Sequence, residues 1–190
     1  MATLEQETRS GSERCWRRLS LWSLLLLVPL ALFETSYDSA RELFQTNDLW
    51  PRDVAAGETA QFGGSQWQFV SLKPAEGVRS RALPAGSQPV IAQFVVEVGN
   101  PDLRTLWLGC SIKLVDASGH IWLPTSIPGM RYRGDSIKSC ASATFSGAKS
   151  GERMVIEENF LVPAAVVKEV RPTLGLGSER PNYLRFDRPI

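Results

Sequence analysis

The chain has 190 residues with 22% charged residues and a formal net charge of +1. This charge balance excludes the electrostatics expected of a general nucleic-acid binder. A single histidine and three cysteines exclude a histidine-rich metal centre and a disulfide-dense scaffold, and no CxxC spacing points to a zinc or thioredoxin-type site. We therefore expect no cofactor and no metal.

The first predicted element is a membrane span over residues 19–37, preceded by a polar tail, residues 1–18. Arg14, Arg17 and Arg18 stand directly before an uncharged run from Leu19 to Phe33. As a helix this run covers only about 22 Å, against a hydrocarbon core of about 30 Å, so flanking uncharged residues and snorkelling arginines would complete the span. The residues chosen to represent the span are Leu19, Trp22, Leu25, Leu26, Pro29 and Phe33.

A cleaved signal peptide is the alternative to an uncleaved signal anchor, because both have a basic start and a short apolar region. The residues after Phe33 offer no good pair of small residues for cleavage, which favours the anchor over a cleaved signal or a buried core helix. Arginines before the span and acidic residues after it predict a cytoplasmic N-terminus. Residues 38–57 are then a linker, and the remaining chain is extracytoplasmic, either periplasmic or on the cell surface.

From residue 58 onward the pattern is that of short strands. Gly63 and Gly64 predict a hairpin turn, and the alternation from Val90 to Val98 predicts a half-buried strand. A second strand is expected over Leu106–Leu114, where the even-numbered side chains share one face. A turn at residues 116–119 and a short strand at 120–123 follow it.

The second half of the domain begins with a long irregular segment, residues 124–151, rich in Gly, Ser and Pro. Alternation resumes at 153–162, and a further strand is expected at 166–176, where Pro172 suggests an edge or a bulge. A last short strand is expected at 183–186. Residues 58–190 are therefore predicted to form an all-β, immunoglobulin-like antiparallel β-sandwich, preceded by one N-terminal transmembrane helix.

Three segments resemble bacterial extracytoplasmic immunoglobulin-like domains, the group that includes the mycobacterial immunoprotective secreted antigen. These segments are the strand PVIAQFVVEVGN, the turn LVDASGHIWLP and the sequence ENFLVP before a final strand. The resemblance covers most of residues 66–176 and implies a fold and a location outside the cytoplasm. It implies no catalytic residues, because that group shares none.

Two cysteines are expected to lie on the oxidising side of the membrane. Cys110 belongs to a predicted strand and Cys140 to the long loop, and a disulfide between them would close a loop of about 30 residues. A buried free thiol at Cys110 is the alternative. Cys15 is expected to be cytoplasmic and reduced.

Candidate sites for chemistry are sparse. Asp116, Ser118 and His120 occur in one tight turn, which does not form a catalytic relay, and Glu157 and Glu158 are adjacent and point to opposite faces of a strand. Arg131, Tyr132 and Arg133 form a cationic, aromatic group on the long loop, a composition found at interface anchors, although a solvated loop has the same appearance.

These features predict that the chain is not an enzyme. We expect a membrane-anchored extracytoplasmic interaction module, an accessory subunit that docks onto another integral membrane or envelope protein. The alternative is a secreted or anchored immunoglobulin-like domain that binds a small ligand or glycan through exposed tryptophans. Nucleic acid is not an expected partner.

Overall fold

A computed structural model describes residues 3–75, 83–127 and 137–188, with side chains from residue 16 onward. The chain divides into two compact units, Met1–Leu43 and Phe44–Ile190, which are described separately. The elements are α1 (Thr3–Thr46), β1 (Trp50–Val54), β2 (Thr59–Phe62), β3 (Ser65–Pro74), β4 (Ser87–Val98), α2 (Leu103–Leu106), β5 (Ser111–Val115), β6 (Ile121–Trp122), β7 (Ile137–Lys138), α3 (Cys140–Thr144), β8 (Arg153–Pro163), β9 (Arg171–Gly175), the 3-10 helix η2 (Gly177–Glu179) and β10 (Asn182–Phe186).

Helix α1 is longer than the predicted span 19–37. It runs for 44 residues and also covers most of the predicted tail and the start of the predicted linker. Leu, Ala, Glu, Gln and Arg are frequent on both sides of the apolar run, and these residues have high helix propensity. The helix continues through Pro29, a residue that transmembrane helices accommodate more readily than soluble ones.

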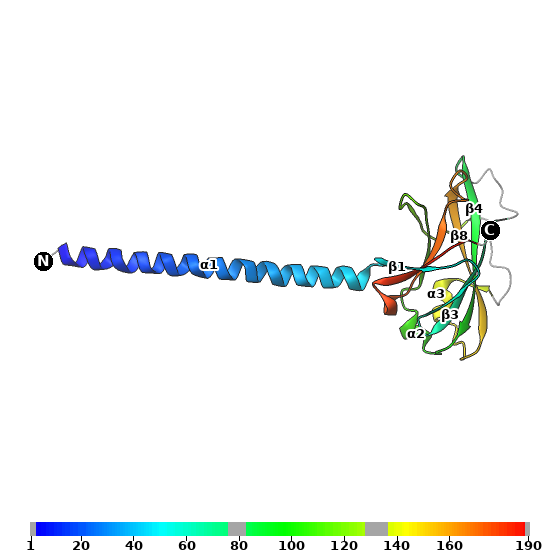
Figure 1. The fold of residues 1–190 in the computed structure, drawn as a ribbon, viewed down its shortest axis with the longest axis horizontal. Coiled ribbons are helices and arrows are strands. Elements are labelled where there is room, and N and C mark those ends of the chain that lie inside the picture. Colours follow the sequence, from blue (N-terminus) through cyan, green and yellow to red (C-terminus); the bar gives the residue numbers. More distant parts are fainter. Residues whose placement is uncertain (1–2, 76–82, 128–136, 189–190) are drawn as a thin grey trace. The chain divides into compact units, whose positions relative to one another are not determined.

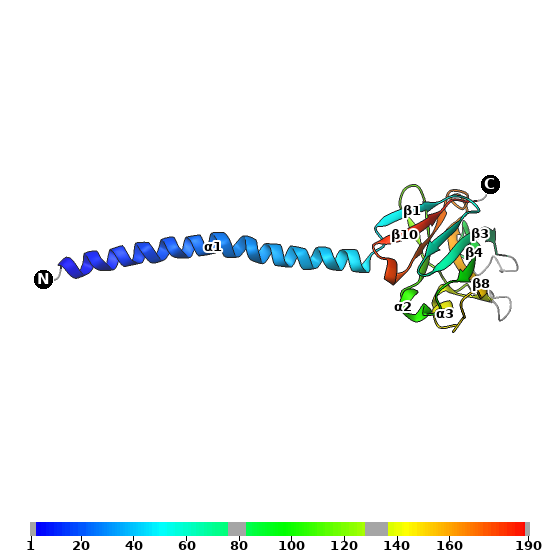
Figure 2. The same cartoon turned by 60° about the horizontal axis from the view of Figure 1, so that its bottom comes forward.

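The second unit is a sandwich of two five-stranded sheets, with strand orders β1-β10-β9-β5-β6 and β2-β3-β4-β8-β7. The long pair β4 and β8 forms the middle of the second sheet, drawn green and orange in Figure 1. Most pairs are antiparallel, as predicted, but β1 pairs with β10 and β7 pairs with β8 in parallel. Figure 2 shows β1 beside β10.

The core lies between the sheets and follows the alternation read from the sequence. In β4 the even-numbered side chains from Val90 to Val98 are at most 1% exposed, and the odd-numbered ones are only partly covered. Trp67 and Trp107 are fully buried with ring centroids 4.7 Å apart. Each indole nitrogen donates to a backbone carbonyl at the β2–β3 turn, that of Phe62 or of Gly63, so the predicted hairpin is also tied to the core.

The predicted strand Leu106–Leu114 is wrong in its first half. The Asn100 side chain accepts a hydrogen bond from the Asp102 backbone at 3.0 Å, and α2 follows this turn. The helical turn directs Trp107 into the core and leaves Leu108 61% exposed, so the strand begins only at Ser111. The turn at 116–119 and the hairpin between β5 and β6 are as predicted.

The predicted strand 166–176 is shorter in the structure, where residues 164–169 form turns and β9 starts at Arg171. Pro172 does not lie at a sheet edge, because β9 is the central strand of its sheet. The proline is tolerated because it is the second residue of β9, and the ladder with β10 reaches only Thr173 and Leu174.

The predicted linker 38–57 contains β1, which belongs to the sandwich. Where β1 begins, the chain is held by backbone hydrogen bonds from Leu49 and Trp50 to the carbonyl of Pro181. Asp48, whose side chain is 8% exposed, accepts hydrogen bonds from Lys113 at 2.7 Å and from Arg180 at 3.2 Å. The first residues of the sandwich are therefore fixed by charge as well as by strand pairing.

Candidate functional site

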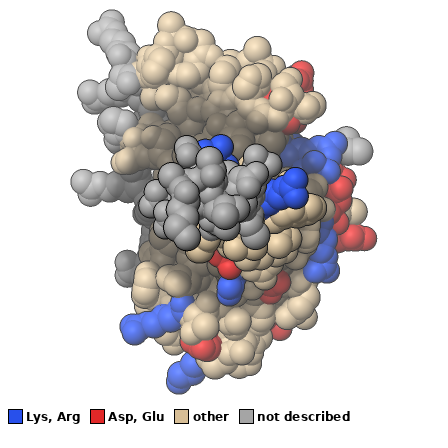
Figure 3. All heavy atoms as spheres, turned by 90° about the vertical axis from the view of Figure 1, so that its left-hand side faces the viewer, with Lys and Arg blue, Asp and Glu red and all other residues tan. Residues whose placement is uncertain are grey.

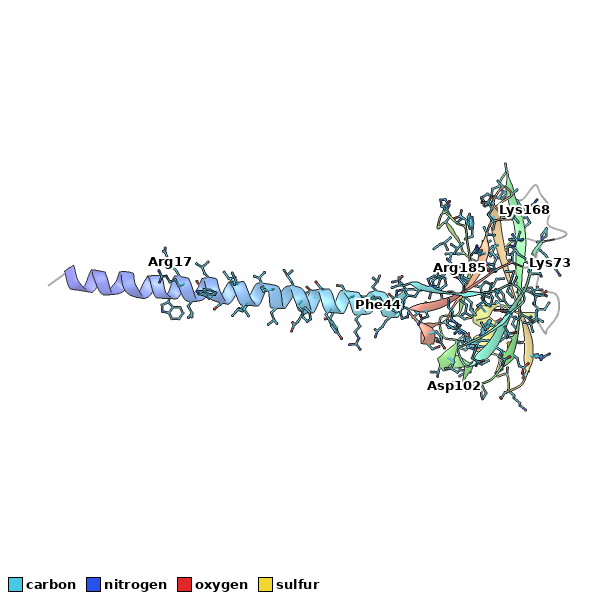
Figure 4. The ribbon with its side chains drawn as sticks, viewed as in Figure 1. Arg17, Phe44, Lys73, Asp102, Lys168 and Arg185 are labelled. Atoms are coloured by element: carbon cyan, nitrogen blue, oxygen red, sulfur yellow. A yellow bond between two sulfur atoms is a disulfide. The ribbon has the colours of Figure 1, made fainter. Side chains whose placement is uncertain are left out.

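The apolar part of α1 is exposed along its whole length. The side chains of Leu19, Trp22, Leu25, Leu26 and Phe33 are each at least 60% exposed, and Pro29 is exposed too. Arg17, labelled in Figure 4, and Arg18 precede this run. An apolar surface of this length is costly in water and stable in hydrocarbon.

Hydroxyl groups within α1 are satisfied by the helix itself. Ser20 donates to the carbonyl of Arg17, Ser23 to that of Leu19, and Thr35 to that of Ala31. Such bonds remove the need for water at polar side chains inside an apolar segment. Residues Trp16–Thr46 are thus a candidate membrane span by length and composition, and a secretion signal meets the same criteria.

The predicted disulfide is present. Cys110 and Cys140 are joined across 30 residues with their Cα atoms 5.6 Å apart. The bond attaches α3 to the chain just before β5, and Ser139 caps the helix by accepting a hydrogen bond from the backbone of Ser142 at 3.1 Å. The disulfide therefore fixes α3 at one end of the sandwich, and α2 and α3 lie together at the lower edge of the domain in Figure 2.

Glu158 is the buried acid of this region. It occupies the inward face of β8 together with Met154, Ile156 and Phe160, and it is 6% exposed. One carboxylate oxygen accepts a hydrogen bond from the backbone of Cys140 at 2.8 Å. Burial raises the pKa of the Glu158 carboxyl above its ordinary value, and this hydrogen bond opposes the rise in part. Glu157 lies on the other face, as the alternation predicted, and accepts a hydrogen bond from the Gln93 side chain.

A second feature of this end is an exposed apolar patch, here called the α2–α3 patch and made of Leu108, Phe145 and Arg104. Leu108 is 61% and Phe145 is 63% exposed, and the Arg104 guanidinium lies 5.9 Å from the centre of the Phe145 ring. The hydroxyl of Thr144 donates to the carbonyl of Trp107, which holds the two halves of the patch together. Exposed apolar side chains grouped with an arginine are typical of interface anchors.

The turn at Asp116 is structural, as expected. Asp116 accepts hydrogen bonds from the backbones of Ser118 and His120 and contacts the His120 ring nitrogen Nδ1 at 2.9 Å. The His120 side chain lowers the pKa of Asp116, and the backbone donors add to that effect. The Ser118 backbone, rather than its hydroxyl, contacts the acid, so the three residues do not form a nucleophile relay.

Arg131, Tyr132 and Arg133, the predicted partner-binding residues, lie outside the described residues. The alternative of ligand binding requires exposed tryptophans, but Trp67 and Trp107 are in the core and Trp122 is partly buried against it. Trp50 is 54% exposed and packs its ring on Phe44 at a centroid distance of 5.5 Å. Sequence reasoning missed the α2–α3 patch, because Leu108 was assigned to the strand expected over Leu106–Leu114 and Phe145 to the long irregular segment 124–151.

Charges of both signs occur on one face of the molecule. On the face drawn in Figure 3, Lys and Arg side chains lie among Asp and Glu side chains. Within the part of the chain that the structure describes, no group of three or more His, Cys, Asp or Glu side chains could hold a metal ion.

Taken together, the described residues form a two-sheet β-sandwich with one disulfide, preceded by one apolar helix. No family model matches the chain, and no curated protein matches its sequence. Several solved structures are similar in arrangement and share 9–17% identity with the chain.

Three of these structures illustrate the range. An uncharacterized β-sandwich protein from Clostridium difficile has a TM-score of 0.41 and 11% identity, covering 72% of this chain and 93% of its own. The secreted protein MPT63 from Mycobacterium tuberculosis has a TM-score of 0.41 and 17% identity, covering 72% and 98%. The YjhA protein from Bacillus subtilis has a TM-score of 0.42 and 13% identity, covering 70% and 99%.

Proposed function

We propose that the chain is a membrane-anchored extracytoplasmic interaction module, an accessory subunit that docks onto another integral membrane or envelope protein. The observation that carries the proposal is the apolar run of α1, whose side chains are exposed and whose hydroxyls are satisfied internally. We interpret this helix as an uncleaved signal anchor with its N-terminus in the cytoplasm, since arginines precede the run and acidic residues follow it.

The sandwich is the part that lies outside the cytoplasm in this proposal. The Cys110–Cys140 disulfide supports that location, because such bonds persist in oxidising compartments. An immunoglobulin-like type of sandwich belongs to the same proposal and is supported by two sheets with mostly antiparallel ladders.

The α2–α3 patch is the surface that we assign to docking. Its two apolar side chains together with Arg104 could supply the buried centre of a protein contact. Binding of a glycan to a row of exposed tryptophans is less well supported, since Trp67 and Trp107 fill the core.

The test is mild-detergent purification of the full-length tagged chain, followed by mass spectrometry of the intact chain and its companions. An intact N-terminal helix with a stoichiometric membrane protein supports the proposal. A mass beginning after the apolar run refutes the anchor, and an intact chain without a companion refutes the accessory role.

Matched variants then locate the docking surface. Leu108→Ser with Phe145→Ser should release the companion, because both substitutions remove exposed apolar area from the patch. Ile121→Ser with Leu123→Ser is the control, since these side chains are 58% and 63% exposed but lie elsewhere, in and after β6. Equal losses in both variants would contradict the assignment.

A further inference from the structure

The chain enters the sandwich through a pair of exposed aromatic side chains, here called the entry pair and made of Phe44 and Trp50. Phe44, labelled in Figure 4, lies in the last turn of α1, and Trp50 is the first residue of β1. Their ring centroids are 5.5 Å apart, and the two side chains are 40% and 54% exposed. Aromatic rings that are packed together at the surface form a contiguous apolar area, which is costly in water.

The entry pair stands on ordered backbone. The amides of Leu49 and Trp50 both donate to the carbonyl of Pro181, and Trp50 opens the ladder between β1 and β10. Asp48, two residues earlier, is held by two cationic side chains. A surface that binds the Trp50 ring would therefore hold the whole sandwich in one orientation.

The charges beside Trp50 suit a surface that carries phosphate groups. Arg52 is exposed and lies on the same face of β1, because side chains two positions apart in a strand point the same way. Its guanidinium donates one hydrogen bond, to the carbonyl of Gln61 at 3.3 Å, and a guanidinium is well suited to phosphate oxygens. Asp53 points to the other face and is paired with Arg185, so it does not offset the charge of Arg52.

The length of chain between the proposed span and the entry pair limits how far the rings lie from the bilayer. The predicted span ends at residue 37, and α1 continues as a helix through Thr46. At 1.5 Å per residue, the segment 38–44 extends about 10 Å. The headgroup layer is about 5–8 Å thick on each side of the hydrocarbon core. Tilt of the helix and the length of the aromatic side chains cover the difference.

We propose that Phe44 and Trp50 insert into the headgroup region of the bilayer that α1 spans, and that they hold the sandwich against this lipid surface. The inference rests on the proposed function, because it requires α1 to be a membrane anchor. Tryptophan is enriched at membrane interfaces, where its apolar ring and its polar N–H are both satisfied. The entry pair is thus a second membrane contact, made by the sandwich itself.

This contact also bears on the docking surface assigned above. The backbone of Gly177 donates to the carbonyl of Leu108 at 2.8 Å, and Pro181, shortly after it in the chain, accepts the bonds from the entry segment. The α2–α3 patch and the entry pair therefore lie at the same end of the sandwich. A sandwich held by the entry pair keeps this patch near the lipid surface, where the partner is a membrane protein rather than a soluble one.

The proposal is tested on the full-length chain in phosphatidylcholine nanodiscs, with its six tryptophans replaced by 5-fluorotryptophan and their fluorine resonances assigned by single tryptophan-to-phenylalanine variants. One paramagnetic probe is a phosphatidylcholine with a nitroxide near the carbonyl end of an acyl chain. The other is a water-soluble gadolinium chelate. Trp122 is the internal reference, because β6 and β1 are opposite edges of one sheet, roughly 19 Å apart at the usual strand spacing.

The lipid nitroxide should broaden the resonances of Trp50 and of Trp22, which lies near one end of the span, and leave that of Trp122 sharp. The aqueous chelate should broaden Trp122 more than Trp50, although the Trp50 side chain is the more exposed of the two. This reversal is expected only if lipid covers the Trp50 ring.

The outcomes separate this inference from the anchor itself. A sharp Trp50 resonance beside a broadened Trp22 resonance would refute the entry-pair contact and leave the anchor standing. Nitroxide broadening of neither residue would refute the anchor, and the contact with it. Stronger broadening of Trp50 than of Trp122 by the aqueous chelate would also overturn the proposal, since it would show that Trp50 is merely tethered near the membrane.

Variants of Phe44 test whether the two rings act together. Phe44→Ala should lower the ratio of docked to undocked sandwich about threefold or more, because an apolar ring is lost from the contact, and the nitroxide broadening of Trp50 reports this. Phe44→Leu keeps an apolar side chain and should retain most of the broadening. Leu123→Ala is the matched control, because Leu123 is 63% exposed but follows β6 at the opposite edge of the sheet.

A purely structural role of Phe44 predicts a different result. Removal of its ring would uncover Trp50, so the nitroxide broadening would stay the same or rise. Unchanged broadening of Trp50 in Phe44→Ala, or an equal loss in Leu123→Ala, would therefore overturn the proposal. Circular dichroism checks that each variant is folded, and the comparison of Trp50 with Trp122 in the wild type decides the case if Phe44→Ala is not.

Discussion

Asp48 and Glu158 are both withdrawn from solvent in this sandwich, and their surroundings differ. Asp48, at the entry of the chain, accepts hydrogen bonds from Lys113 and Arg180. Glu158, at the disulfide-bearing end, has one backbone donor and an apolar strand face around it. Disrupting a buried carboxylate that is paired with two cations is strongly destabilising, whereas a buried carboxylate with a single backbone donor carries a desolvation cost that the fold offsets only in part.

The largest loss of stability is expected when the disulfide beside Glu158 is removed. Replacing both Cys110 and Cys140 by Ser should lower the free energy of unfolding by about 3–4 kcal/mol, because a constraint on a loop of 30 residues is lost. Urea unfolding followed by the fluorescence of the buried tryptophans measures this. Reductant should bring the wild type to the same value and leave the variant unchanged; an effect on both would contradict the explanation.

The next effect concerns Asp48. Asp48→Ala should lower the free energy of unfolding by about 2–3 kcal/mol, at or below the lower end of the range for breaking a buried ion pair. The loss is limited because the side chains of Lys113 and Arg180 are each about one-quarter exposed and can be partly resolvated. Urea unfolding measures this loss as well. A loss of stability smaller than that expected for an exposed ion pair would contradict the view that Asp48, unlike Glu158, is held by its charged partners.

Gly175 provides an independent test of the same site. A Cβ atom at this position would lie 2.5 Å from Asp48 Oδ2, so Gly175→Ala should destabilise by about 1–3 kcal/mol. In the Asp48→Ala background the same substitution should cost much less, because the clashing carboxylate is gone. Additive costs in the double variant would show that the close approach is not the cause.

Glu158→Gln, unlike the substitutions above, is not expected to lower the free energy of unfolding at neutral pH. The raised pKa means that the folded state holds its proton more tightly than the unfolded state, so this stabilisation is present below the ordinary pKa and is lost as pH rises through the raised one. The variant should therefore be at least as stable as the wild type at neutral pH and less dependent on pH. Unfolding between pH 4 and 8 tests this, and a variant less stable than the wild type at pH 7 would be contrary evidence.

The smallest effect is expected at an exposed ion pair. Asp53 contacts Arg185, labelled in Figure 4, through two hydrogen bonds at 2.6 and 3.0 Å, and the Arg185 side chain lowers the pKa of Asp53. Asp53→Asn should cost less than about 1 kcal/mol, since solvent screens the pair. The contribution is present above the ordinary pKa and disappears as pH falls through the lowered one; a cost equal to that of Asp48→Ala would contradict the ranking.

The sequence predicted the parts of the sandwich whose pattern is local. Val90–Val98 and Met154–Val162 alternate because one face of each strand is buried, and two glycines identify the β2–β3 turn. Helix α2 was missed because it has four residues and depends on the burial of Trp107, which is a tertiary effect.

The pairing of Asp48 with Lys113 and Arg180 could not be read from the sequence, because these residues are brought together only by the folded sheet. Glu158 gave a usable signal. It stands on the apolar side of an alternating strand, where an acid is unexpected, and it made the middle of the strand pattern ambiguous.

The parallel pairing of β1 with β10 has a consequence for the order of folding. Asp53 and Arg185, opposite each other in this pair, are 132 residues apart in the chain. At ribosomal rates of about 5–20 residues per second, β1 waits on the order of ten seconds for its partner strand. Completion of the first sheet is therefore a late event, and the strand nearest α1 is secured only after nearly all of the sandwich has been synthesised.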